Sequence, residues 1–107
     1  MRYQLYETDK AEKSRKKLER GGRHIKEAIE KTYEQLSEDP FYGTTFLKGP
    51  LRGKRKKKFM RKLRIEFAIC EECRRFGHKD LNKCVDCEYM PDNSVKIFDI
   101  FYREKGY

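Results

Sequence analysis

Residues 48–65 carry ten Lys or Arg and no Asp or Glu, and this run constrains the fold more than any other feature of the 107-residue chain. Only 17 other Lys and Arg remain to balance the 18 Asp and Glu, so the formal charge of +9 comes almost wholly from this run. Such a concentration of positive charge repels itself and favours binding to a polyanion. Because the run leads directly into an alternating apolar stretch, the sequence predicts that the charge lies on a sheet rather than on a disordered tail.

The length and composition favour one domain, spanning residues 1–107, with a modest core. Hydrophobic residues make up 36% of the chain and charged residues 42%, so the seven Phe and seven Tyr must supply much of the buried area. No apolar run approaches the roughly 20 residues that cross a bilayer, and the N-terminus lacks an apolar signal core. We therefore expect a cytoplasmic protein with no membrane partner, in which disulfides are disfavoured.

The first 40 residues are predicted to form a short strand at 2–6 and two helices. Thr8 or Asp9 can cap the first helix, which runs to about residue 20, where Gly21 and Gly22 break it. The second helix runs from about residue 23 to 37 and ends before Pro40, because the residue before a proline is pushed out of the helical region. Its apolar stripe, at helical spacing, consists of Ile25, Ala28, Ile29, Tyr33 and Leu36.

Three more strands are predicted at 54–59, 63–69 and 94–103, and residues 41–53 are predicted to form a connector. Residues 63–69 alternate in the manner of a half-buried strand, so Arg64 is expected to point outward, away from the buried side chains on either side of it. Three consecutive strands favour an antiparallel meander whose one face the helices cover. The sequence therefore predicts an α+β fold in which two N-terminal helices pack on a small antiparallel sheet.

A cysteine-rich insert, residues 70–93, separates the last two predicted strands. Its two CxxC pairs are ten residues apart and can supply four thiolates to a tetrahedral Zn(II) site. Four cysteines leave no open coordination position, so we expect a structural zinc at the tip of a hairpin, with the metal supplying folding energy. Two disulfides are the disfavoured alternative, and His78 is a less favoured ligand. The predicted ligands are Cys70, Cys73, Cys84 and Cys87.

Several short motifs follow one another in a distinctive order: LSEDP at 36–40, LKGPLRG at 47–53, the basic strand, LRIEF at 63–67 and IFYREKGY at 100–107. In this order the chain resembles the RelE/ParE toxin superfamily, specifically the RelE-like mRNA interferases, along nearly its whole length. The resemblance implies a RelE-like fold and a toxin that inhibits translation by cutting mRNA in the ribosomal A site. It also implies a cognate antitoxin that wraps the toxin. Typical members lack the cysteine insert.

The resemblance places catalytic positions on the basic strand, on the strand after it and near the C-terminus. Carried over by position, the catalytic residues are Lys57, Arg64, Arg103 and Tyr107. Because residues 55–58 are all basic, the match along this strand can shift by one residue. The resemblance and the charge together predict that the neighbouring cations bind RNA: Lys54, Arg55, Lys56, Lys58, Arg61 and Lys62.

These residue types suit cleavage by attack of the RNA 2′-hydroxyl. Lys57 is expected to take part in proton transfer, and Arg64 and Arg103 are expected to hold the phosphate with permanent charge. Tyr107 is expected to stack on a base or to help move the proton. The chain has no His pair or acidic cluster of an ordinary ribonuclease, so the enzymatic prediction depends on the resemblance.

Two other functions are compatible with the same sequence. One is a non-catalytic, zinc-containing module that binds RNA or a ribosomal surface. The other is a ParE-like toxin that acts on DNA gyrase, which the excess of cations on the central strands disfavours. Substitution of a catalytic residue separates the nuclease from the binding module, because it abolishes cleavage while weakening RNA binding only modestly.

Overall fold

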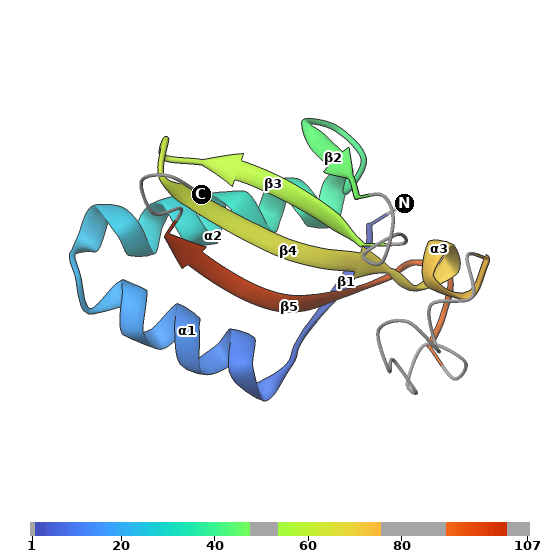
Figure 1. Cartoon of the computed structure of the whole chain (residues 1–107), viewed down its shortest axis with the longest axis horizontal. Coiled ribbons are helices and arrows are strands. Elements are labelled where there is room, and N and C mark those ends of the chain that lie inside the picture. Colours follow the sequence, from blue (N-terminus) through green and yellow to red (C-terminus); the bar gives the residue numbers. More distant parts are fainter. Residues whose placement is uncertain (1, 48–53, 76–89, 103–107) are drawn as a thin grey trace.

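The structure is a computed structural model that describes residues 2–47, 54–75 and 90–102 (Figure 1). Within these ranges no helix is both long and apolar enough to cross a membrane. In chain order the elements are β1 (Gln4–Glu7), α1 (Asp9–Glu19), α2 (Arg23–Glu38), β2 (Thr44–Phe46), β3 (Arg55–Phe59), β4 (Leu63–Ile69), α3 (Cys70–Arg75) and β5 (Ser94–Tyr102).

The five strands form one sheet in the order β1-β5-β4-β3-β2. β1 runs parallel to β5, with Gln4 opposite Ser94, while the other neighbouring pairs are antiparallel. The predicted small antiparallel sheet is therefore corrected to a mixed one. The predicted connector also contains β2, an edge strand of three residues that pairs with β3. The α+β class and the predicted antiparallel order of β3, β4 and β5 are confirmed.

The helices begin and end where the sequence indicated. Thr8 is the N-cap of α1, and its Oγ1 accepts a hydrogen bond from the backbone nitrogen of Ala11 at 3.0 Å. Gly22, with φ of 150°, separates the two helices, and α2 ends two residues before Pro40. In Figure 1, α2 lies behind the sheet and α1 runs alongside β5. The core between helices and sheet includes Ile25, Ile29, Leu36, Leu63, Ile65, Phe67, Ile97 and Ile100.

The central strand β4 presents different side chains to the two faces of the sheet. Leu63, Ile65 and Phe67 belong to the core with the helices. Since successive side chains of a strand point to opposite faces, Arg64 and Glu66 lie on the face that α2 does not cover. We call this second face the open face. On this face, charged side chains of three adjacent strands lie side by side, with Lys56 of β3 next to Glu66 of β4 and Glu66 next to Asp99 of β5.

Candidate nucleic-acid interface

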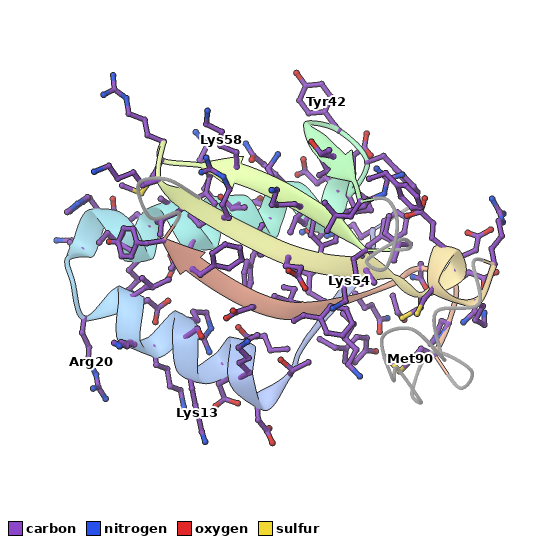
Figure 2. All side chains as sticks on the ribbon, viewed as in Figure 1. Lys13, Arg20, Tyr42, Lys54, Lys58 and Met90 are labelled. Atoms are coloured by element: carbon purple, nitrogen blue, oxygen red, sulfur yellow. The ribbon has the colours of Figure 1, made fainter. Side chains whose placement is uncertain are left out.

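The register of β3 against β4 divides the basic run into two sets. Lys58 pairs with Arg64 and Lys56 with Glu66, so Lys56, Lys58 and Arg64 share the open face. Lys57 pairs with the core residue Ile65 and therefore points to the helix side. We call Lys56, Lys58 and Arg64 the cationic face. Figure 2 shows Lys54 and Lys58, four residues apart on the same stretch of chain.

Arg64 is buried, with 4% of the residue exposed, although it lies on the open face. Arg64 thus points away from the core residues Leu63 and Ile65, as predicted, but its side chain is covered by the protein. Its Nη1 donates hydrogen bonds to the carbonyl of Leu63 at 2.9 Å and to that of Arg61 at 2.8 Å, which fold the side chain back along the chain. Within the described ranges no carboxylate forms an ion pair with it. A guanidinium held in this way retains N–H groups that suit a phosphate.

The turn between β3 and β4 supplies one of the two carbonyls that hold Arg64. Met60 and Arg61 have φ angles of 48° and 60°, in the left-handed region that non-glycine residues seldom adopt. This conformation costs roughly 1–2 kcal/mol per residue. It brings the carbonyl of Arg61 against the Arg64 guanidinium. The turn therefore helps to orient the side chain of Arg64.

Lys57, the predicted proton-transfer residue, does not lie beside Arg64. It is 9% exposed, and its Nζ donates to the carbonyl of Tyr42 at 3.4 Å. A Cβ on Gly43, which has φ of 70°, would lie 3.1 Å from that Nζ. Lys57 thus supports the turn before β2. In the register of β3 against β4, Lys58 is the cross-strand neighbour of Arg64, and Lys56 is the neighbour of Glu66.

Arg55, predicted to bind RNA, is engaged inside the protein. Its Nε donates to Oε1 of Glu72 at 2.8 Å and its Nη2 to Oε2 at 2.9 Å. Its Nη1 donates to Oγ1 of Thr44 at 3.2 Å, and its Cζ lies 4.9 Å and 5.4 Å from the ring centres of Phe41 and Phe46. These contacts join β2, β3 and α3, so Arg55 has a structural role in this conformation.

Lys54 also has an internal partner, and sequence reasoning missed it. Its Nζ donates to Oε1 of Glu66 at 3.0 Å and lies 4.5 Å from the centre of the Phe98 ring. Glu66 is the one acid in residues 54–69, and its spacing of two from Arg64 is the sequence signal that places both on one face. Phe98 gave no such signal, because it lies at an irregularity in the pairing of β4 with β5.

The remaining predicted site residues divide by location. Lys58, Arg61 and Lys62 are exposed on or near the hairpin that carries the cationic face. Arg103 and Tyr107 lie outside the described residues, so their predicted roles stay predictions. The geometry therefore brings together Arg64, Lys58 and Lys56, and adds Glu66 as a neighbouring acid.

Half of the predicted zinc site lies within the described residues. Cys70 and Cys73 are buried on α3, with Met90 and Phe98 packed against them. A spacing of three residues puts both sulfurs on the same side of this helix. Two shielded thiols side by side are suitable donors for Zn(II). Cys84, Cys87 and His78 lie outside the described residues, and the remaining ranges contain no other group of three or more potential ligands.

A second polar cluster joins β1 to the two long helices. Arg15 donates to Glu7 at 2.7 Å and to Glu19 at 3.2 Å, and the hydroxyl of Tyr33 donates to Oε2 of Glu7 at 2.6 Å. Burial first, and then the hydrogen bond to Glu7, raise the pKa of Tyr33 above its ordinary value. The phenol therefore stays protonated at neutral pH, and the cluster stabilises the fold rather than moving protons.

Comparison with known proteins finds likeness in structure but not in sequence families. No family model matches the chain, and no curated protein matches it. A chain of the toxin–antitoxin complex RelBE2 from Mycobacterium tuberculosis superposes with a TM-score of 0.67 at 18% identity, over 96% of this chain and 100% of that one. The YoeB/ParE toxin from Agrobacterium tumefaciens superposes with a TM-score of 0.68 at 12% identity, over 94% and 99%. The protein thus shares the α+β fold of chains from these toxin systems.

Proposed function

We propose that this protein is the toxin of a toxin–antitoxin pair and that it inhibits translation by cutting mRNA on the ribosome. The likeness to RelBE2 and to the YoeB/ParE toxin supports the toxin role. The cationic face supports RNA as the target, because adjacent strands present the Arg64 guanidinium and the exposed Lys58 ammonium on one surface. The complex named for RelBE2 supports an antitoxin as the natural partner of this chain.

One observation carries the proposal: the Arg64 guanidinium is almost fully buried, is aimed by two carbonyls and has no carboxylate partner among the described residues. Transferring a charged group from water into the protein interior is unfavourable unless an opposite charge compensates it. A phosphate of RNA provides that charge and accepts from the guanidinium in two parallel hydrogen bonds. Arg64 is therefore assigned to the scissile phosphate, where it stabilises the extra negative charge that develops during attack.

The reaction we propose is attack of a 2′-hydroxyl on the adjacent phosphorus. The new bond joins the 2′-oxygen to phosphorus, the bond to the 5′-oxygen breaks, and the products are a 2′,3′-cyclic phosphate and a 5′-hydroxyl. The Lys58 ammonium, opposite Arg64 on β3, is assigned to give a proton to the leaving 5′-oxygen, in place of Lys57. Arg103 remains assigned to binding the phosphate. Tyr107 remains assigned either to stacking on a nucleobase or to accepting the proton that the 2′-hydroxyl loses.

Zinc is proposed as a structural element of this toxin. Cys70 and Cys73 would supply two thiolates from α3, and Cys84 and Cys87 the other two. A metal there would complete the fold of the insert that separates β4 from β5. The metal supplies no step of the cleavage, because four thiolates leave no coordination position for RNA or water.

The test is primer extension on an mRNA in programmed translating ribosomes. The variants are Arg64→Gln and Lys58→Gln, with Lys57→Met as the matched control from the other face of β3. We expect A-site cuts with the native protein, a loss of about 100-fold or more in Arg64→Gln, and near-native cutting in Lys57→Met. Melting curves of each variant exclude unfolding as the cause of the loss.

The outcomes separate the competing functions. Absence of cuts from the folded, zinc-loaded native protein rejects the nuclease. Retained RNA binding would then indicate a non-catalytic module, and inhibition of DNA supercoiling by gyrase would indicate the ParE-like activity.

A further inference from the structure

We propose that a depression next to the cationic face binds one nucleobase of the RNA and selects guanine. The proposal rests on RNA as the ligand of the open face, as proposed above. The depression has a volume of about 310 Å³ and lies where β4 and β5 meet the N-terminus of α1. Its lining combines two carboxylates, two lysines, a hydroxyl and one aromatic ring: Glu66, Asp99, Lys10, Lys54, Thr8 and Phe98.

The depression lies within reach of an RNA chain whose phosphate is held by Arg64. Glu66, which lines it, follows Arg64 by two residues on β4 and shares its face. Two residues of a strand span roughly 6.6 Å, which is comparable to the distance between neighbouring groups of a nucleotide chain. Lys54, which also lines it, lies over the front of the sheet in Figure 2. A nucleotide next to the bound phosphate can therefore place its base there.

Glu66 gives the depression a chemistry that differs from the rest of the face. Its Oε1 accepts from Lys54, while its Oε2 has no hydrogen-bond partner among the residues that the structure describes. The side chain is 23% exposed, so this oxygen can be reached by a ligand. A carboxylate repels phosphate but accepts hydrogen bonds from the N–H groups of a base. The depression is therefore suited to a base rather than to a second phosphate.

The pairing of Glu66 with Lys54 favours guanine among the four bases. Guanine presents two adjacent donors, N1–H and N2–H, next to the acceptor O6. The two donors can both donate to the Glu66 carboxylate, and O6 can accept from the Lys54 ammonium. The Nζ of Lys54 lies 3.0 Å from Oε1 of Glu66. Adenine and cytosine offer one donor beside one acceptor, so they form fewer bonds. Uracil places a carbonyl on each side of its single N–H, and one of them would meet the carboxylate.

Asp99 is held in place and does not compete for the base. Its Oδ1 accepts from the hydroxyl of Ser14 and from the backbone nitrogen of Ile100, both at 2.9 Å, and its Oδ2 lies 3.4 Å from the Nζ of Lys10. The Phe98 ring, which Lys54 covers, forms a wall of the depression. Glu66 is therefore the residue assigned to recognise the base, with Lys54 as its partner.

The test is calorimetric titration of the full zinc-loaded protein with the four nucleoside 3′-monophosphates. We expect 3′-GMP to bind about tenfold more tightly than 3′-UMP, in line with the discrimination given by a bidentate contact to a base. Glu66→Gln should bring the four affinities to within about twofold of one another. Lys58→Gln, the control, should weaken all four equally, since it acts on the phosphate.

Equal binding of the four nucleotides by the native protein overturns the subsite, and so does a lack of measurable binding by all four. A guanine preference that survives Glu66→Gln overturns the role of this residue; melting curves establish that the variant is folded. The readout is independent of cleavage. Ribosomal cuts without any guanine preference would reject the subsite alone, and guanine-selective binding without cuts would reject the nuclease alone.

Discussion

Arg55 on β3 and Glu72 on α3 form a bidentate ion pair, with nitrogen–oxygen distances of 2.8 Å and 2.9 Å. The pair joins the basic strand to the helix that carries Cys70 and Cys73. A charge that the sequence assigns to RNA thus serves to anchor the cysteine-bearing helix to the sheet. Lys58, by contrast, lies on the other face of β3, opposite Arg64, and is exposed.

Breaking this ion pair should destabilise the folded protein. The two side chains are only 15% and 13% exposed, so Glu72→Gln leaves the Arg55 charge uncompensated in a poorly hydrated place. We expect a loss of about 3 kcal/mol in the free energy of unfolding, measured by urea denaturation of the zinc-loaded protein. The control is Glu71→Gln, which removes an exposed partner of Arg75 and should cost less than about 1 kcal/mol. Equal losses in the two variants would contradict the anchoring role.

The two neighbouring lysines of β3 should differ in their effect on RNA binding. Lys58 shares the open face with Arg64, while Lys57 donates to the carbonyl of Tyr42 on the helix side. For a single-stranded RNA, Lys58→Gln should lower the slope of log affinity against log salt concentration by about 0.7 for the phosphate contact that is lost. Lys57→Met should leave the slope unchanged. Fluorescence anisotropy at a series of salt concentrations measures both, and the reverse result would restore the assignment made from sequence.

Zinc should be required for the stability of the cysteine-rich insert, including α3. Elemental analysis should find one zinc per chain, and chelation at neutral pH should lower the melting temperature. Cys73→Ser should reduce the zinc content, because it removes a thiolate from the buried pair on α3. Glu71→Gln, in the same helix, should retain the metal. Full zinc content in Cys73→Ser, or disulfides in place of zinc in the protein as purified, would contradict this prediction.

Tyr33 should make stability fall at alkaline pH. Burial and the hydrogen bond to Glu7 raise its pKa in the folded protein above the value of about 10 in the unfolded chain. Its contribution is therefore fully present below pH about 10 and is lost as the pH rises toward the folded pKa.

Tyr33→Phe tests this contribution. The variant should lose about 1.5–3 kcal/mol at neutral pH, because the Glu7 carboxylate loses a donor, and its stability should fall less steeply above pH 10. Urea denaturation at a series of pH values provides the measurement. Tyr42→Phe is the control, since that residue is 78% exposed, and it should follow the native profile. Identical pH profiles for native protein and Tyr33→Phe would exclude the predicted role.

Local signals predicted the elements well, because each depends on nearby residues. The Thr8 cap, the Gly21–Gly22 break and the apolar stripe of α2 determine helices within a few residues. The parallel pairing of β1 with β5 joins residues about 90 positions apart, and no local pattern encodes it. β2 was missed since three residues are too few to show an alternating pattern.

The sequence could not predict, for a different reason, which lysines of β3 lie on the same face of the sheet as Arg64. Alternation predicts that Lys57 and Lys58 point to opposite sides, but the register against β4 decides which of them meets Arg64. A shift of one residue in that register exchanges the two faces. The register depends on the length and shape of the turn between β3 and β4. This turn contains two left-handed residues, Met60 and Arg61, and neither is a glycine or an asparagine, the residues that would have indicated such a turn in the sequence.

That turn provides the last prediction. Met60 and Arg61 adopt left-handed angles, so replacing them together by Asn and Gly should relieve part of the backbone cost and raise the free energy of unfolding by about 1 kcal/mol. The Arg64 guanidinium should stay in place, since its partner is the backbone carbonyl of residue 61 and not a side chain. Urea denaturation measures the gain, and ribosomal primer extension should show cutting at the native sites, at a rate lowered only by the loss of the Arg61 charge from the RNA-binding surface. Met60→Val, a β-branched control, should destabilise the protein, because its side chain tolerates the left-handed region poorly. A destabilised Asn-Gly variant would show that the turn is not left-handed, and a stable variant that no longer cuts would show that the Met60 or Arg61 side chain itself meets the RNA.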